Sequence, residues 1–234
     1  MTKELTIVVP AYNEQDRLVK TVNEIVEVAD KVLTSWELIL VNDGSTDRTR
    51  EVAESLRDIR PGEIQILDLQ QNKGVGNAFL LGLSKASKEF ITLIPGDNAF
   101  TISGVRTLFS SVGDAELVIS YRSNPAARTF LRRWLSRFAT LVLRLISGRQ
   151  IRDAHSMFVY PVKVARQFKF SPGYGYHMET LSRMLLIANS VKEVPVELNP
   201  KPDASSGVMR MQTLYILGST ALRLLWLRIT GRLT

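Results

Sequence analysis

Hydrophobic residues follow two alternating patterns along the first half of the chain. Short β-branched and apolar runs are typical of buried strands, and between them apolar residues recur at helical spacing. The runs lie at residues 5–9, 36–41, 63–69, 90–94 and 116–120. The first is expected to end at Pro10, because proline cannot continue a central ladder. Strands alternating with helices predict an α/β fold with a doubly wound, mostly parallel sheet.

After residue 120 the pattern changes to a single long amphipathic helix over residues 128–146. Arg133, Arg137 and Arg144 occupy roughly the face opposite its apolar stripe, and acidic residues are missing from that face. This composition favours an interfacial helix on a membrane over an ordinary surface helix. The apolar stripe consists of Leu131, Trp134, Leu135, Phe138, Leu141, Val142 and Leu145.

The last part of the chain adds a helix ending near residue 188, a strand over 191–198 and an apolar tail. The tail, residues 214–229, is interrupted only by Arg223 and Arg228. It is shorter than the ~20 residues that a membrane-spanning helix needs. We expect it to lie in the membrane interface or against the arginine-rich helix, with a buried core helix as the alternative.

Length and composition fit one globular domain with an appendage. The chain has 234 residues, of which 45% are hydrophobic and 23% charged. We expect a domain over residues 1–208, with the helix 128–147 inserted in it, followed by a membrane-associated helix at 209–234. The absence of cysteine excludes disulfides, cysteine-ligated metals and thiol catalysis. No secretory signal pattern precedes the first strand, so we expect a cytoplasmic location.

A net charge of +7 indicates a polyanionic partner. The arginines gather in residues 122–152 and 210–232, where they stand among Leu, Ile, Trp and Phe rather than with lysine, glycine and stacking aromatics. This setting favours a membrane surface over nucleic acid. No nucleic-acid partner is therefore expected.

A candidate for chemistry stands after the fourth predicted strand, in the tetrapeptide Pro-Gly-Asp-Asn at residues 95–98. Ligands of open α/β sheets bind beyond the carboxyl ends of the strands, so Asp97 is expected to contact substrate or metal, the alternative being a plain turn. Gly74 and Gly76 suggest a dinucleotide fingerprint, but Phe79 stands where its third glycine belongs. We therefore reject dinucleotide binding.

Three motifs are spaced along the first 125 residues. They are Val-Val-Pro-Ala-Tyr-Asn-Glu at 8–14, Val-Asn-Asp-Gly-Ser-Thr-Asp at 41–47 and Asn-Lys-Gly at 72–74. Together they resemble the family-2 inverting glycosyltransferases with the GT-A fold, and most of all the dolichyl- or polyprenyl-phosphate sugar synthases. The later part of the chain resembles that family through weaker matches.

The resemblance implies a nucleotide-sugar site. Tyr12 and its neighbours match the part that holds base and ribose, and Asp43 matches a second nucleoside-binding carboxylate. Lys73 matches a position near the diphosphate, where a cation offsets the charge of the leaving group. The residues expected at this site are Pro10, Tyr12, Glu14, Asp43, Lys73, Gly74, Asp97 and Lys201.

A divalent metal is implied at Asp97, which falls on the second carboxylate of the family's Asp-x-Asp motif. The first position of that motif is Pro95, and the usual downstream glutamine is Ala99. One carboxylate together with diphosphate oxygens can still hold Mg²⁺ or Mn²⁺, because such ions keep several waters in their shell.

The acceptor site is implied in the second half of the chain. Arg122 and Arg133 match arginines that grip the lipid phosphate, a role that suits the bidentate guanidinium. With Asp97 they are the expected catalytic residues. Residues 153–158 resemble the family's Asp-x-x-Ser-Gly-Phe segment, with methionine in the glycine position. The residues expected at the acceptor site are Arg122, Arg133, Asp153, Ser156, His177 and Glu179.

A lipid phosphate is already ionised near neutral pH, so its attack needs positioning and leaving-group stabilisation rather than a strong base. The expected function is transfer of a hexose from GDP-mannose or a UDP-sugar to polyprenyl or dolichyl phosphate at the cytoplasmic face of a membrane. Two alternatives stay open. One is a non-lipid acceptor, for which Asp153 or Glu179 would act as base, and the other is an inactive nucleotide-sugar binding module. Whether a separate subunit supplies a membrane anchor is also open.

Overall fold

The computed structural model describes most of the chain. It covers residues 2–124, 130–154, 157–168 and 175–199, and from the C-terminal segment 218–220, 222–224, 226, 228 and 230. Of residues 130–133 and 135 only the helical backbone is described. The predicted domain boundary at residue 208 lies outside these ranges and stays a prediction.

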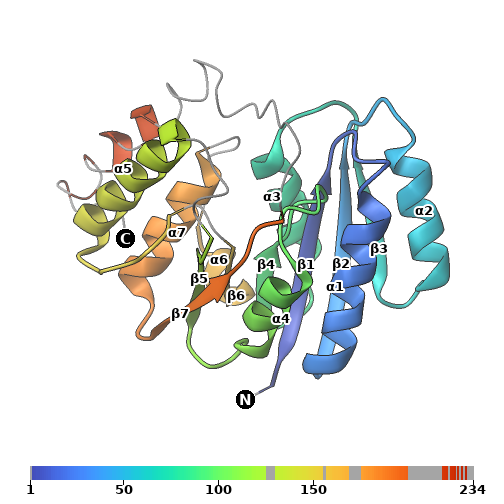
Figure 1. The fold of residues 1–234 in the computed structure, drawn as a ribbon, viewed down its shortest axis with the longest axis horizontal. Helices are drawn as coiled ribbons and strands as arrows, with labels where there is room; N and C mark the ends of the chain where they lie inside the picture. Colours follow the sequence, from blue (N-terminus) through green and yellow to red (C-terminus); the bar gives the residue numbers. More distant parts are fainter. Residues whose placement is uncertain are drawn as a thin grey trace.

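A seven-stranded sheet in the order β3-β2-β1-β4-β6-β5-β7 forms the centre of the molecule (Figure 1). All its ladders are parallel except the two made by β6, which runs antiparallel to both β4 and β5. The predicted α/β fold with a mostly parallel sheet is therefore confirmed. The strands are β1 (Glu4–Ala11), β2 (Ser35–Asp43), β3 (Ile64–Leu69), β4 (Phe90–Leu93), β5 (Leu117–Arg122), β6 (Phe158–Pro161) and β7 (Val191–Val196).

Strand β1 continues through Pro10 to Ala11, past its predicted end. The Pro10 carbonyl accepts a hydrogen bond from the Gly96 N–H at 3.1 Å, so Pro10 turns its backbone groups toward the β4 side. On that side the ladder ends at the pair Val8 and Leu93, while the β2 side still pairs Pro10 with Val41. The missing N–H of proline thus falls where no ladder partner is needed.

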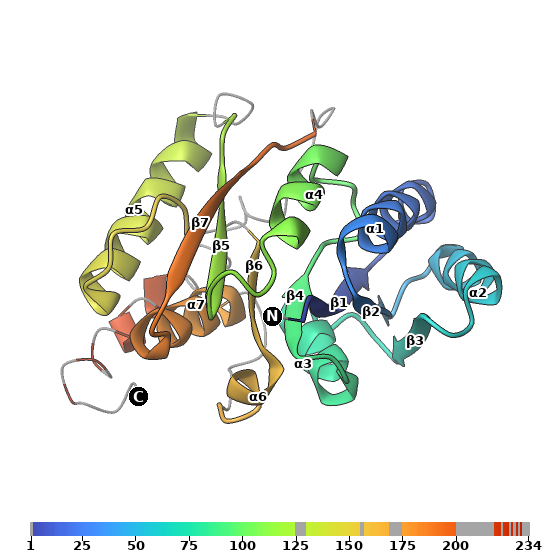
Figure 2. The ribbon, with the colours of Figure 1, turned by 90° about the horizontal axis from the view of Figure 1, so that it is seen from below.

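Helices cover both faces of the sheet. One core contains buried residues of α1, α2 and α4, and the other contains residues of α3, α5, α6 and α7. Figure 2, viewed along the sheet, shows α1 and α4 on one side and α3, α6 and α7 on the other. The helices are α1 (Leu18–Val32), α2 (Thr49–Ile59), α3 (Val75–Lys85), α4 (Ile102–Ser110), α5 (Phe130–Ser147), α6 (Val162–Ala165) and α7 (Tyr176–Ile187).

Helix α5 buries a different stripe from the one expected. Ala139, Val142, Leu143 and Ile146 face the core, so of the described residues of the predicted apolar stripe only Val142 is buried. Arg144 also turns inward, because its Nε donates to the Ile151 carbonyl at 2.8 Å. Among the side chains of α5 that the structure describes, four large apolar ones are exposed, namely Trp134 (57%), Phe138 (50%), Leu141 (51%) and Leu145 (68%).

The described part of the C-terminal segment is helical and packs on the start of α7. A Cβ at Gly175 would lie 2.5 Å from the Thr220 hydroxyl, so the Thr220 side chain packs closely on the Gly175 backbone. Leu224 is buried, whereas Leu222 and Trp226 are exposed. Within the described ranges, every helix is too short or too polar to cross a membrane.

Candidate functional site

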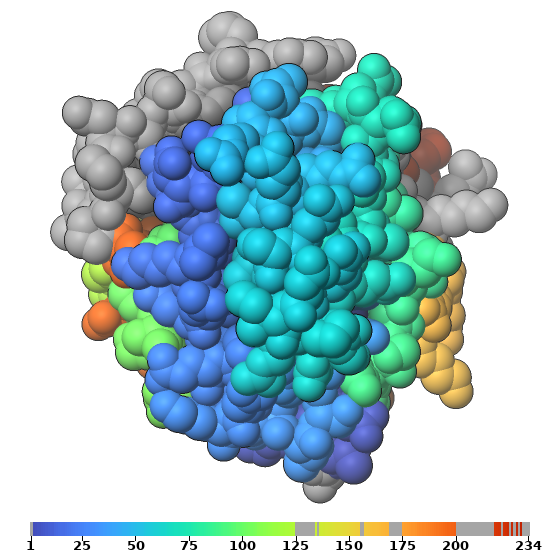
Figure 3. Space-filling view, turned by 90° about the vertical axis from the view of Figure 1, so that its right-hand side faces the viewer, coloured from blue at the N-terminus to red at the C-terminus, as the bar shows by residue number. Residues whose placement is uncertain are grey.

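The loops after β1 and β2 form one hydrogen-bonded unit at the carboxyl edge of the sheet. The Asn13 N–H donates to the Ser45 hydroxyl at 3.1 Å, and its side-chain oxygen accepts from the Thr46 N–H at 2.8 Å. The Glu14 N–H donates to the Thr49 hydroxyl at 2.8 Å. Helix α2 begins directly after the second loop, at Thr49, and forms part of the face shown in Figure 3. The two predicted nucleoside loops thus support each other.

Pro10, Tyr12 and Glu14 lie together in the first of these loops. Pro10 is buried in β1, while the Tyr12 ring is exposed at the edge of the sheet. The Glu14 carboxylate is half-buried and contacts Arg17 at 3.4 Å. The arrangement offers an accessible aromatic face and a carboxylate side by side, which suits a base and its ribose.

Asp43, at the end of β2, orients the loop that precedes α3. Its two buried oxygens accept hydrogen bonds from the backbone N–H groups of Lys73, at 2.8 Å, and Gly74, at 2.9 Å. Gly74 has a φ of 84°, a left-handed conformation that favours glycine. The Lys73 side chain is exposed. Asp43 therefore positions the predicted diphosphate loop, and its direct contact with a nucleoside stays a prediction.

The Asp47 carboxylate accepts hydrogen bonds at the start of α2, where the N–H and the hydroxyl of Thr49 donate to it at 3.0 Å and 2.5 Å. Burial opposes ionisation of Asp47, but the hydroxyl and N–H of Thr49 and the N–H of Gln15 donate to its carboxylate. These bonds outweigh burial and lower the pKa of Asp47 below its ordinary value. Ionised Asp47 thus fastens the second nucleoside loop to its helix.

The turn that carries Asp97 is anchored to β1 and α1. Gly96 donates its N–H to Pro10 and accepts at its carbonyl from the Thr21 hydroxyl at 2.9 Å. An Asp97 carboxylate oxygen accepts from the Ala99 N–H at 3.2 Å. The carboxylate is half-buried, one strand away from the nucleoside loops. The Asp97 turn and the three motifs thus lie along one edge of the sheet.

The donor set at this edge fits a metal completed by its substrate. Among the described residues no three His, Asp or Glu side chains gather into a group that could enclose an ion. Asp97 is the only carboxylate between residues 95 and 99. Mg²⁺ commonly takes one or two carboxylates together with substrate phosphates and waters, so a single aspartate is compatible with it.

Arg122 and Asp153 pair with each other on the acceptor side. The Arg122 Nε and one terminal nitrogen each contact a carboxylate oxygen of Asp153 at 2.5 Å, and the side chains are 5% and 9% exposed. Arg122 also donates to the Ser136 hydroxyl on α5 at 3.2 Å. Both predicted acceptor residues are therefore held in one buried ion pair that joins β5, α5 and the segment before β6.

His177 and Glu179 lie in the first turn of helix α7, close to β6. The His177 ring contacts the edge of Phe158, at the start of β6, with centroids 4.8 Å apart. Glu179 is buried and lies 3.3 Å from Arg183 and 3.6 Å from Arg223 of the C-terminal helix. Glu179 thus ties the acceptor side of the sheet to the apolar tail.

The structure does not describe the side chains of three predicted site residues. Ser156 and Lys201 lie outside the described residues, and for Arg133 only the backbone of α5 is described. Their roles stay predictions. Sequence reasoning missed Glu24, Asn98 and Asn199, which surround the Asp97 turn. Asn98 could have been identified from the sequence, because it directly follows Asp97 and asparagine is common in turns. Its partners Glu24 and Asn199 are distant from it in the sequence and gave no such signal.

Comparison with known proteins identifies a family model and several relatives. The model of the family described as Glycosyl transferase family 2 matches residues 6–170. The dolichyl-phosphate beta-glucosyltransferase ALG5A of Trichomonas vaginalis is 30% identical over 89% of this chain and 71% of its own length. The dodecaprenyl-phosphate galacturonate synthase of Rhizobium johnstonii is 28% identical over 71% of this chain and 50% of its own.

Solved structures show the same fold. Glucosyl-3-phosphoglycerate synthase of Mycobacterium tuberculosis, in complex with uridine diphosphate, superposes with a TM-score of 0.66 at 19% identity. The match covers 93% of this chain and 80% of that enzyme. Its complex with Mn²⁺, uridine diphosphate and glucosyl-3-phosphoglycerate gives a TM-score of 0.61 at 19% identity over 98% and 79% of the two chains. The fold is the predicted GT-A fold.

Proposed function

The chain belongs to glycosyltransferase family 2, and we propose that it transfers a hexose, with inversion, from a nucleotide-sugar to polyprenyl or dolichyl phosphate at a membrane surface. The observation that carries the proposal is the hydrogen bond between Gly96 and Pro10, which ties the Asp97 turn to the end of β1, where the first predicted nucleoside loop begins. Relatives that act on dolichyl or dodecaprenyl phosphate support the choice of acceptor. The cytoplasmic face and a separate anchoring subunit stay predictions.

The donor half of the site binds the nucleotide through two loops. Tyr12 and Glu14 hold base and ribose, and the Asp43 carboxylate keeps the backbone of Lys73 and Gly74 in place beside the diphosphate. The exposed Lys73 ammonium is then available to offset the negative charge of the departing nucleoside diphosphate. GDP-mannose and UDP-sugars both fit this chemistry.

Asp97 is the residue that would hold Mg²⁺ or Mn²⁺ against the diphosphate. When bound, the ion supplies electrostatic stabilisation of the leaving group. The chain itself fixes the direction of the Asp97 carboxylate, because one of its oxygens accepts a hydrogen bond from the Ala99 N–H. The solved relatives that contain Mn²⁺ or Mg²⁺ with uridine diphosphate support a metal-assisted donor site.

The acceptor half requires cations for a phosphate that needs no deprotonation. Arg122 donates hydrogen bonds to Asp153 and Ser136, so it forms part of the wall of the site. Arg133 then carries the larger share of phosphate binding. The exposed apolar side chains of α5 continue from this wall and suit contact with acyl or prenyl chains of a membrane.

A panel of radiolabelled GDP-mannose, UDP-glucose and UDP-N-acetylhexosamine, with and without Mn²⁺, tests the proposal. Each donor is incubated with polyprenyl phosphate or with free saccharides, and organic extraction separates lipid-linked from soluble product. Label in the lipid phase from one donor is the expected result. Label only in soluble saccharides would favour a non-lipid acceptor, and no transfer with any donor would favour an inactive binding module.

A further inference from the structure

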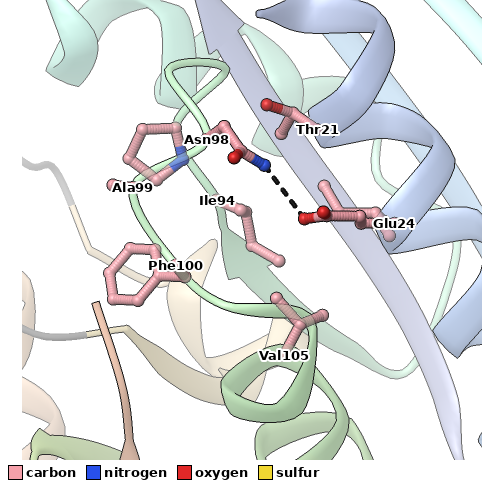
Figure 4. Close-up of a pocket in the computed structure, with 9 residues that line it drawn as sticks. Thr21, Glu24, Ile94, Asn98, Ala99, Phe100 and Val105 are labelled. Atoms are coloured by element: carbon pink, nitrogen blue, oxygen red, sulfur yellow. Dashed lines mark hydrogen bonds between the residues drawn. The ribbon is translucent and has the colours of Figure 1, made fainter. Parts of the chain in front are cut away.

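Asn98 lies at the centre of a hydrogen-bonded network behind the Asp97 turn. Its side-chain nitrogen donates to a carboxylate oxygen of Glu24 on α1 at 2.9 Å, a bond drawn in Figure 4. On the other side, the Asn199 side-chain nitrogen donates to the Asn98 side-chain oxygen at 3.1 Å and to its carbonyl at 3.0 Å. One residue thus connects α1, the turn and the segment after β7.

The polarity of this network is fixed. Glu24 is a carboxylate and can only accept, so the Asn98 amide must present its nitrogen to α1 and its oxygen to Asn199. Asn199 in turn meets the Phe100 carbonyl at 2.8 Å as well as the two oxygens of Asn98, so it must present its nitrogen to the turn. Each amide therefore has one orientation, and the three side chains form one connected chain.

The backbone conformation of Asn98 also holds the turn in place. Its φ of 52° lies in the left-handed region, which asparagine tolerates better than most residues. Asp97 on one side of it accepts from Ala99 on the other, so the left-handed residue sets the direction of the carboxylate. The Asn199 N–H further donates to the Ala99 carbonyl at 3.0 Å. The turn is thus held on both sides of its reactive residue.

We propose that Asn98 and Glu24 are positioning residues, which preset the Asp97 carboxylate for the metal-bound diphosphate of the donor. This inference rests on the proposed function, because it takes Asp97 as the metal ligand. Neither Glu24 nor Asn98 contacts the nucleoside loops through a hydrogen bond of the network, so they act on the diphosphate and not on the base. Because these hydrogen bonds form without a ligand, binding of the donor does not carry the entropic cost of ordering the three side chains.

The distinction between diphosphate and base gives a binding test. Calorimetry of the full chain with Mn²⁺ compares UDP and GDP with UMP and GMP. Glu24→Ala and Asn98→Gly are expected to weaken binding of the preferred diphosphate about tenfold and to leave its monophosphate within about twofold. Glu24→Gln keeps an acceptor for Asn98 and is expected to bind like the unaltered chain. Glu27→Ala, one turn along α1, is the matched control.

Asn98→Gly retains the left-handed backbone, so it carries the test even if Glu24→Ala does not fold. Equal weakening of diphosphate and monophosphate would overturn the inference, because it would indicate general destabilisation. So would unchanged diphosphate binding in both variants. Failure of the unaltered chain to bind any of the four nucleotides would instead contradict the proposed function.

Discussion

Arg122 and Asp153 form a buried ion pair that fastens the end of β5 to the segment before β6. Because neither side chain is accessible, removing one partner leaves the other charge buried and uncompensated. Arg122→Ala and Asp153→Ala are each expected to lower the free energy of unfolding by about 3–5 kcal/mol. The double change of Arg122→Met with Asp153→Leu is expected to lie closer to the unaltered chain.

Denaturant unfolding measures these differences. Asp114→Ala is the control, because its pair with Lys192 is 41% and 45% exposed and is expected to contribute no more than about 1 kcal/mol. Single variants as stable as the control would contradict the interpretation. Transfer assays of Asp153 variants are informative only at temperatures where these proteins remain folded.

Asp97→Ala is expected to abolish transfer, and Asp97→Asn to be nearly as damaging, because an amide cannot offset the charge of a divalent ion. Radiolabel transfer under single-turnover conditions measures both. The Asp68→Asn variant, at the end of β3, serves as the control for loss of a carboxylate at the same sheet edge. Substantial activity in either Asp97 variant would move the metal–diphosphate contact elsewhere in the chain.

Arg133→Ala is expected to raise KM for a short, water-soluble polyprenyl phosphate about tenfold or more, since a charge-assisted contact to phosphate is lost. Binding of the nucleoside diphosphate is expected to stay unchanged. Arg137→Ala, one turn further along α5, is the matched control. If Arg133→Ala leaves KM unchanged while Glu179→Gln abolishes transfer, a non-lipid acceptor with Glu179 as base becomes the better hypothesis.

The exposed apolar stripe of α5 gives a membrane prediction. Phe138→Ser and Leu141→Ser are each expected to weaken partition into vesicles of phosphatidylglycerol and phosphatidylcholine about tenfold, because each removes one exposed apolar side chain that the lipid would bury. Sedimentation with the vesicles measures it. Ile59→Ser is the control, because Ile59 is even more exposed, at 75%, and lies at the end of α2, far from α5. Equal loss in all three variants would argue against a specific face.

Asp47 predicts a dependence of stability on pH. Hydrogen bonds lower the pKa of its carboxylate in the folded chain, so its stabilising effect is present above the pKa of an unfolded aspartate. The effect is lost as the pH falls through the lower, folded value. The difference in Tm between the unaltered chain and Asp47→Ala is therefore expected at pH 7 and should shrink below about pH 4. Asp16→Ala controls for net charge, and a constant difference would contradict the prediction.

Periodicity predicted most of the sheet because its parallel strands are buried on both faces and read as continuous apolar runs. It could not predict the direction of β6, since Phe158, Val159 and Tyr160 are equally apolar in either orientation. The buried face of helix α5 was predicted wrongly for a related reason. It carries two apolar stripes, and only packing against α7 decides that Leu143 is inside and Leu141 outside.

The sequence predicted which residues lie at this edge of the sheet where local motifs follow consecutive strands, as with Asp43, Lys73 and Asp97. Contacts between distant segments were not. Nothing in the sequence linked Arg122 with Asp153, or Asn98 with Asn199, because each pair is set by the order of strands across the sheet. Charge and residue type suggested which side chains matter, and the fold determined whether they face a ligand or each other.

The reversed direction of β6 changes which end of a strand carries the predicted acceptor residue Asp153. Donor residues follow strands that leave the sheet at this edge, whereas Asp153 precedes a strand that enters there. An insertion or deletion in residues 148–152 would therefore reshape the acceptor wall while β1, β2 and β4 kept their ends in place. Changes in this connection are therefore expected to alter acceptor binding while nucleotide binding stays unchanged.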